Sequence, residues 1–121
     1  MYFDTKTMTG TAVILASNDY QAVPLKIDET DTVKAGMPIT QDGKKTPSGS
    51  GAIGILLYDV DPARNPNAAV VVDGIIDWAK VKSYNSDVTA DAQAIATALP
   101  RITFREVDGE DGDGKTYNSV Q

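Results

Sequence analysis

Two apolar runs separated by a proline-rich turn constrain the fold of this 121-residue chain more than any other feature. Residues 53–60 read IGILLYDV and residues 68–72 read AAVVV. Each run is almost unbroken in apolar residues, which predicts strands buried on both faces. Asp-Pro at 61–62 and Asn-Pro at 65–66 exclude a helix between them, because proline removes a backbone donor and restricts the residue before it. The sequence therefore predicts a β-rich domain built around these two strands.

The N-terminal third also predicts strands and turns. Residues 11–16 form a short apolar run, and residues 20–27 alternate between apolar and polar side chains. The Ser-Asn-Asp between them favours a turn, so the two segments predict a hairpin. Pro38 predicts an edge strand or a strand start. Residues 41–50, which read QDGKKTPSGS, predict a flexible loop on the surface.

A helical period appears in the C-terminal half of the chain. Apolar residues recur at helical spacing between residues 88 and 99, where Asp87 or Thr89 is expected to cap the helix and Pro100 to end it. The apolar positions are Val88, Ala92, Ile95, Ala96 and Leu99. The pattern predicts one short amphipathic helix, and the alternation at 102–105 predicts a last strand.

These segments predict a mainly β, small α+β fold, a compact β-sandwich or barrel-like domain with one short helix. We expect three parts, an N-terminal arm (residues 1–10), one β-rich domain (11–107) and a disordered acidic tail (108–121), because the tail has few apolar groups. Trp78 follows an apolar run, and we expect it to close the end of the core with its indole N–H bonded to a carbonyl or a water.

Several segments match a known family in their order and spacing. They are V-K-A-G-M-P-I at 33–39, a polar glycine-rich spacer, G-I-L-L-Y-D-V-D at 54–61, A-A-V-V-V at 68–72, and Gly74 followed by I-I-D at 75–77. With these segments the chain resembles the small head decoration and head-fibre proteins that bind the outside of tailed-phage capsids. The resemblance covers roughly the middle half of the chain.

The resemblance implies a non-enzymatic structural protein that decorates and stabilises the exterior of a phage capsid. Its partner would be the major capsid protein, its location the capsid exterior of the virion after synthesis in the host cytoplasm, and its assembly a homotrimer. The arm carries two aromatic side chains, Tyr2 and Phe3. An extended segment that adds a strand to the sheet of a partner would use such residues. We therefore predict capsid-binding residues in the arm, namely Tyr2, Phe3, Asp4 and Thr5.

Composition disfavours other classes of protein. The net charge is −6 without a basic cluster, whereas nucleic-acid binding requires concentrated Lys and Arg. The chain has no cysteine or histidine, no G-x-S-x-G elbow, no membrane-length apolar run and no signal peptide pattern. We expect no nucleic-acid or membrane partner, no catalytic or metal site and no cofactor.

One short motif matches the dinucleotide-binding fingerprint literally. Residues 49–54 read G-S-G-A-I-G, and Asp73 stands where a ribose-binding acid would lie. That fingerprint works where its glycines join a strand to a helix whose N-terminus holds the pyrophosphate. Here a polar loop precedes the motif and a β-branched run follows it, so we expect a loop that enters a strand.

Two acidic motifs also have structural explanations. Residues 108–114 read D-G-E-D-G-D-G, but the fifth position counted from Asp108 is a glycine, and no glutamate closes a twelve-residue calcium loop. Asp59 and Asp61 lie two residues apart on one strand, as paired acid and base carboxylates would. Because Asp-Pro also starts turns, we expect a turn there and a solvated tail at the C-terminus.

A carrier domain is the main alternative function. V-K-A-G at 33–36 is similar to the V-K-x-G turn of biotinyl- and lipoyl-type domains, which present a modifiable lysine at a hairpin tip. Lys44 and Lys45 lack the flanking methionine or alanine of such a lysine. This alternative, or another small β-barrel binding module, ranks second.

Overall fold

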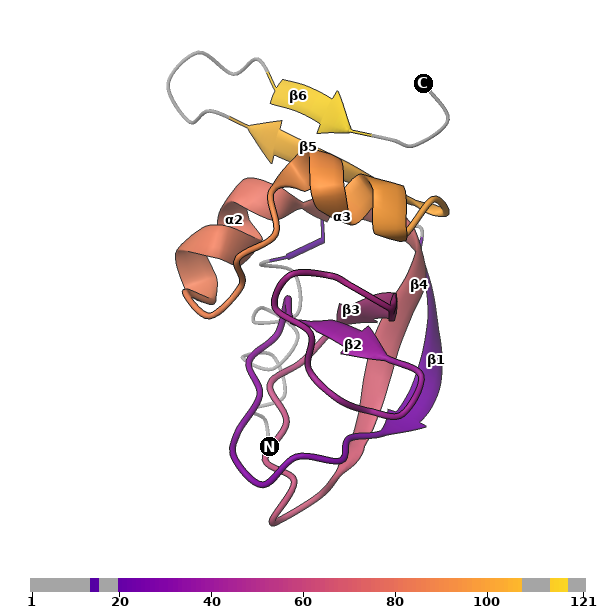
Figure 1. The fold of residues 1–121 in the computed structure, drawn as a ribbon, viewed down its shortest axis with the longest axis vertical. Helices are drawn as coiled ribbons and strands as arrows, with labels where there is room; N and C mark the ends of the chain where they lie inside the picture. The colour runs from indigo at the N-terminus through magenta and orange to yellow at the C-terminus, as the bar shows by residue number, and fades with distance from the viewer. Residues whose placement is uncertain (1–13, 16–19, 108–113, 118–121) are drawn as a thin grey trace, which may run out of the picture.

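A computed structural model describes residues 14–15, 20–107 and 114–117 of the chain (Figure 1). Its elements are β1 (Gln21–Lys26), β2 (Pro38–Thr40), β3 (Ala52–Leu56), β4 (Asn67–Asp77), α2 (Trp78–Tyr84), α3 (Ala92–Ala98), β5 (Ile102–Val107) and β6 (Gly114–Tyr117). The predicted class, mainly β and small α+β, is confirmed.

The long strand β4 organises the sheet. Its first part pairs antiparallel with both β1 and β3, and its last part pairs parallel with β5, which in turn pairs with β6. In place of the two layers of a sandwich, the described strands form one six-stranded sheet in the order β2-β3-β4-β5-β6, with β1 also on β4. Gly74 stands where the pairing passes to β5, and its φ of 141° is one that favours glycine.

Two helices connect β4 to β5, as a parallel strand pair requires a crossover. The Asp77 side chain accepts from the backbone N–H of Lys80 and caps α2, and Asp91 does the same for α3 through Ala94 N–H at 2.7 Å. The prediction of one helix is therefore wrong in number.

The predicted start of the second helix is also wrong. Asp91 caps it in place of Asp87 or Thr89, and it begins four residues after Val88. Val88 is buried although it lies before the helix, which explains why it belongs to the apolar pattern. Burial at helical spacing does not by itself require helical backbone.

The core includes the residues where the helices meet the sheet, and Trp78 is among its largest fully buried side chains. Trp78 and Phe104 are fully buried, with ring centroids 5.2 Å apart in an edge-to-face arrangement. The Trp78 indole N–H donates to the carbonyl of Ala90 at 3.0 Å. The predicted hydrogen bond from the indole N–H of Trp78 to a carbonyl is confirmed.

The N-terminal segments do not form the predicted hairpin in the described part of the chain. Leu15 bridges Ile76, the N–H of Asp77 donates to the carbonyl of Ile14, and β1 pairs with β4. Both segments therefore lie along β4. The strand is long enough to accept both, whereas local turn chemistry alone suggested that they pair with each other.

The outer edge of β1 carries a proline. Leu57 N–H donates to the carbonyl of Ala69, so the backbone groups of Ala69 face β3. Pro24 of β1 lies opposite Ala69. In an antiparallel pair these residues then form a non-hydrogen-bonded position, and the nitrogen of Pro24 faces outward, away from β4.

The prediction of a disordered tail at 108–121 is wrong for four of its residues. Gly114–Tyr117 form β6, paired antiparallel with β5. A strand is held by its backbone groups, which a prediction based on apolar side chains leaves out. Residues 108–113 and 118–121, and the predicted arm at 1–10, lie outside the described residues.

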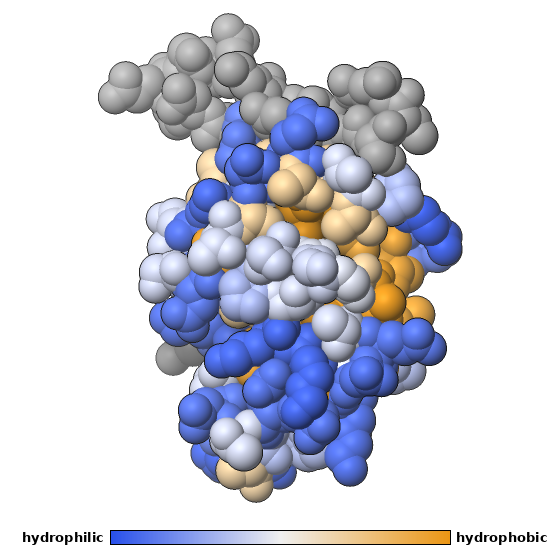
Figure 2. All heavy atoms as spheres, viewed as in Figure 1, coloured by the Kyte–Doolittle hydropathy of each residue, from blue (hydrophilic) through white to orange (hydrophobic). Residues whose placement is uncertain are grey.

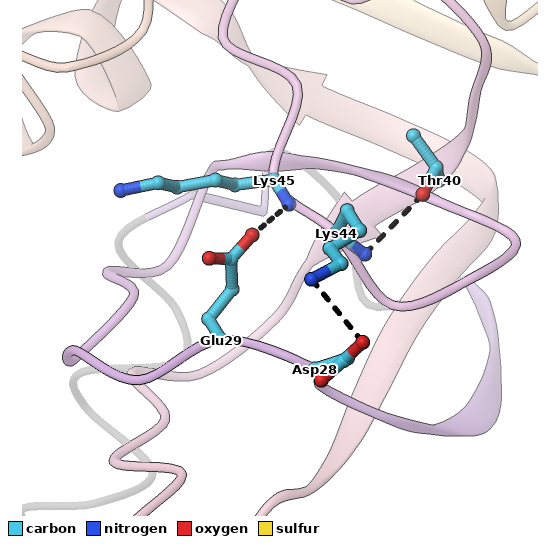
Figure 3. A network of polar contacts seen from close by, with 5 residues as sticks. All are labelled: Asp28, Glu29, Thr40, Lys44 and Lys45. Atoms are coloured by element: carbon cyan, nitrogen blue, oxygen red, sulfur yellow. Dashed lines mark hydrogen bonds and ion pairs between the residues drawn. The ribbon is translucent and has the colours of Figure 1, made fainter.

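The loop at 41–50 is held more firmly than its composition predicts. Lys44 Nζ lies 3.2 Å from Asp28 Oδ2, and Lys45 N–H donates to Glu29 Oε2 at 2.9 Å (Figure 3). Further along the loop, the carbonyl of Pro47 accepts from the N–H groups of residues 89 and 90, both at 3.0 Å. The loop is thus bonded to the segment after β1 and to the turn before α3.

Apolar surface gathers on one flank of the molecule. Figure 2 shows it on the right of the view, beside α3, where Figure 1 draws β4 and β1. Val23 of β1 is exposed there, and Leu25, Val72 and Ile75 are half-buried. The lower part of the same view is mostly hydrophilic.

Candidate interaction surface

Two of the segments that carry the family resemblance, 33–39 and 54–61, lie side by side. Val33 and Val60 exchange two backbone hydrogen bonds of 2.8 Å each. Gly36 N–H donates to the carbonyl of Leu56 at 2.8 Å, and Leu56 N–H donates to the carbonyl of Met37 at 2.9 Å. The V-K-A-G-M-P-I segment and the G-I-L-L-Y-D-V-D segment therefore run as an antiparallel pair.

The turn at 34–36 is fixed by side chains from two other segments. Asp59 Oδ1 accepts from Ala35 N–H at 2.9 Å. Asn85, which is 1% exposed, donates through Nδ2 to the carbonyls of Lys34 and Ala35 at 3.2 and 3.4 Å. These bonds hold the turn against the end of α2 and give the buried amide its partners.

Gly36 is required by this packing. Its φ is 94°, and a Cβ atom built on it would lie 2.7 Å from Cγ1 of Val81 in α2. Only glycine gives both the backbone conformation and the close approach of the turn to the helix. Gly36 thus allows the turn to pack directly on α2.

The side chains of three residues gather at this turn, and we call them the turn surface. They are Lys34, Asp59 and Tyr84. The Tyr84 hydroxyl donates to Asp59 Oδ2 at 2.6 Å, and Lys34 Nζ lies 5.4 Å from the centre of the Tyr84 ring. The Tyr84 side chain is 39% exposed. The surface therefore presents an aromatic ring whose hydroxyl and one face already have partners.

The hydrogen bond to Asp59 raises the pKa of Tyr84 from 10.0 to about 12, with smaller contributions from burial and from the carboxylate charge. The tyrosine therefore remains a protonated donor at neutral pH. Because the folded pKa exceeds the unfolded one, the stabilisation is complete below about pH 10 and is lost as the pH rises toward 12.

The two carboxylates considered as an acid and base pair both stabilise backbone. Asp59 holds the turn and Tyr84, and Asp61 Oδ1 accepts from Ala63 N–H at 3.2 Å in the turn before β4. The bond of Asp61 is that of a turn-forming aspartate, whereas Asp59 bonds to groups far away in the sequence. The geometry gives a structural role for each of these residues.

The glycine motif at 49–54 enters a strand. Its last four residues lie in or next to β3, and the position of a Cβ on Gly54 is only 2.4 Å from the carbonyl oxygen of Val71. Gly54 therefore allows β3 and β4 to approach each other. The strand that follows the loop is the one predicted, and no helix N-terminus follows the glycines as a pyrophosphate site requires.

The predicted arm residues, Tyr2, Phe3, Asp4 and Thr5, lie outside the described residues. In the parts of the chain that the structure describes, no group of three or more His, Cys, Asp or Glu side chains is placed to hold a metal ion. No helix in those parts is long and apolar enough to cross a membrane.

The lysines of the carrier alternative lie just after the tip of the loop that leaves β2. Lys44 is half-exposed and directed toward Asp28, and the side chain of Lys45 extends away from Glu29 (Figure 3). Gly43 before them has a φ of 82°, and a Cβ there would lie 2.1 Å from the carbonyl oxygen of Lys26. The loop is thus seated on the end of β1.

Comparison of the chain with protein-family models, with curated proteins and with solved structures finds no match.

Proposed function

We propose that the chain is a non-enzymatic capsid accessory protein that binds the outer surface of a tailed-phage head and stabilises it. The observation that carries the proposal is the pairing of the two resembling motifs, in which Val33 pairs with Val60 and Gly36 with Leu56. Residues 20 to 27 positions apart in the sequence thus form one structural unit, which gives a structural reason for the order of these two segments.

The mechanism is mechanical. Each copy adds buried contact across neighbouring subunits of the major capsid protein, on the exterior of the virion. Binding to the assembled shell stabilises it by mass action, and many weak contacts add up through repetition. Association of the chain into a homotrimer belongs to the same proposal.

Purified protein is expected to bind expanded heads that lack it and to delay their thermal release of DNA. Cosedimentation with heads measures the binding, and dye access to DNA during heating measures the release. The delay should increase with the fraction of binding sites on the head that are occupied, because only the bound state of the shell is stabilised. Failure to bind such heads would remove the proposal.

Measurement of the intact mass of the protein distinguishes the carrier alternative from the proposed function. After co-expression with a biotin or lipoyl ligase, a carrier domain gains the mass of the adduct on a lysine such as Lys44 or Lys45. For a capsid accessory protein the intact mass should be unchanged.

Deletion of residues 1–7 tests the predicted arm. We expect the truncated domain to keep its melting temperature, because residues 1–7 lack the alternation of apolar and polar side chains of a strand that packs on the core. Capsid affinity should fall by roughly a hundredfold or more, since strand pairing together with burial of Tyr2 and Phe3 contributes a few kcal/mol. Unfolding of the truncated chain, or unchanged affinity for heads, would refute the arm as the docking element.

A further inference from the structure

We propose that the turn surface, Lys34, Asp59 and Tyr84, is a contact through which the folded body of the chain binds the major capsid protein. The inference rests on the proposed function and adds the site and the chemistry of its partner. The matching patch on the capsid exterior would offer an apolar recess for the Tyr84 ring and, beside it, a carboxylate for the Lys34 ammonium.

The first argument is the fixed orientation of Tyr84. The large apolar or aromatic side chains that are exposed in the described part of the chain are Tyr20, Val23, Tyr58 and Tyr84. Tyr84 is held both by the 2.6 Å bond to Asp59 and by the ammonium over its ring. A ring already held in place loses little conformational entropy on binding, and tyrosine is enriched among the residues that dominate protein interfaces.

The second argument is that the polar groups around the ring are already bonded. The Tyr84 hydroxyl has Asp59 Oδ2 as acceptor, and Asp59 Oδ1 is occupied by Ala35 N–H. A partner can therefore cover the ring without leaving an unpaired donor, which would otherwise cost much of the gain from burial. Asp59 satisfies the tyrosine in advance of the partner.

The third argument concerns the charge of Lys34. Among the described residues, the ion pairs within 4.0 Å join Lys44 to Asp28 and Arg101 to Asp73. Lys34 is exposed and has its aromatic contact in place of an ion pair. Its ammonium protons are therefore available to a carboxylate, and the contact with the ring sets where that carboxylate must lie.

The fourth argument is the rigidity of the support beneath the surface. Asn85 holds the carbonyls of the turn, and Gly36 packs directly on Val81. The side chains of the turn surface thus stand on backbone that is bonded to α2 and to the segment after β3. Such a support is what a binding site needs to hold its geometry.

The test compares binding of the full-length chain and its variants to heads prepared without it. Tyr84→Ala and Lys34→Glu are each expected to lower the affinity by about tenfold or more. Tyr84→Phe keeps the ring but loses the bond to Asp59 that orients it, so its affinity should fall between those of the original chain and of Tyr84→Ala. Tyr20→Ala is the matched control, since Tyr20 is 38% exposed, directly precedes β1 and is not part of the turn surface, and it should bind as the original chain does.

The outcomes separate this inference from the proposed function. If the original chain binds heads and Tyr84→Ala and Lys34→Glu bind equally well, the turn surface is not a contact and the proposed function stands. If the original chain does not bind heads, the proposed function fails and this inference with it. If Tyr84→Ala alters the melting temperature, Lys34→Glu decides, because the hydrogen bond from Asn85 is accepted by the backbone carbonyl of Lys34 and does not involve its side chain.

Discussion

Replacement of Trp78 by alanine is expected to lower the free energy of unfolding by about 3–5 kcal/mol. The side chain is fully buried, packs edge-to-face on Phe104, and donates to the carbonyl of Ala90. Its loss leaves a cavity where the sheet meets both helices and an acceptor without its donor. Since a small domain is stable by only about 5–15 kcal/mol, the variant should be close to unfolding at 37 °C. Urea denaturation followed by circular dichroism measures the loss.

Trp78→Phe is the matched control for this prediction. Phenylalanine keeps an aromatic ring against Phe104 and loses the hydrogen bond to Ala90, so it should cost less than alanine does. A loss of less than about 1 kcal/mol for Trp78→Ala would contradict the full burial of this residue in the core.

Replacement of Gly54 by alanine is expected to cost about 3 kcal/mol, at the upper end of the usual range for overpacking. The added Cβ would lie 2.4 Å from the carbonyl oxygen of Val71 and 2.5 Å from Cγ1 of Val70. The nearer atom is backbone and cannot turn aside. β3 must therefore move away from β4. β1 also pairs with β4.

The control for Gly54 is Gly51→Ala in the loop before β3. Gly51 has a φ of 72°, and no atom lies within 4 Å of its Cβ position. Alanine there meets only the strain of the left-handed conformation, about 1–2 kcal/mol. Similar losses for the two variants, compared by thermal melting, would show that the contact between β3 and β4 is looser than the structure describes.

The parts of the fold that follow from apolar patterning could be predicted from the sequence. The run at 53–60 overlaps β3, and the run at 68–72 lies within β4. The apolar spacing after residue 88 includes α3. β6 and α2 could not be predicted in this way. β6 is held by backbone pairing to β5, and α2 has only Trp78 and Val81 buried over its seven residues, too few to establish a period.

The candidate surface is largely invisible to sequence reasoning. Lys34 and Asp59 belong to recognised motifs, but Tyr84 and Asn85 lie about 50 positions from Lys34 and join the turn only in the folded chain. The signal that could have been used is Asn85 itself, since an asparagine next to a helix end often bonds to backbone nearby. Which backbone it reaches is decided by tertiary packing.

The outward-facing nitrogen of Pro24 has a consequence for a protein displayed at high density. On a shell that carries many copies, an open strand edge would allow neighbouring chains to pair edge to edge and polymerise. At Pro24, β1 has no donor to offer along that edge, and the ladder of an incoming strand would be interrupted in its middle. Self-association of the proposed kind would then not run along this edge of β1.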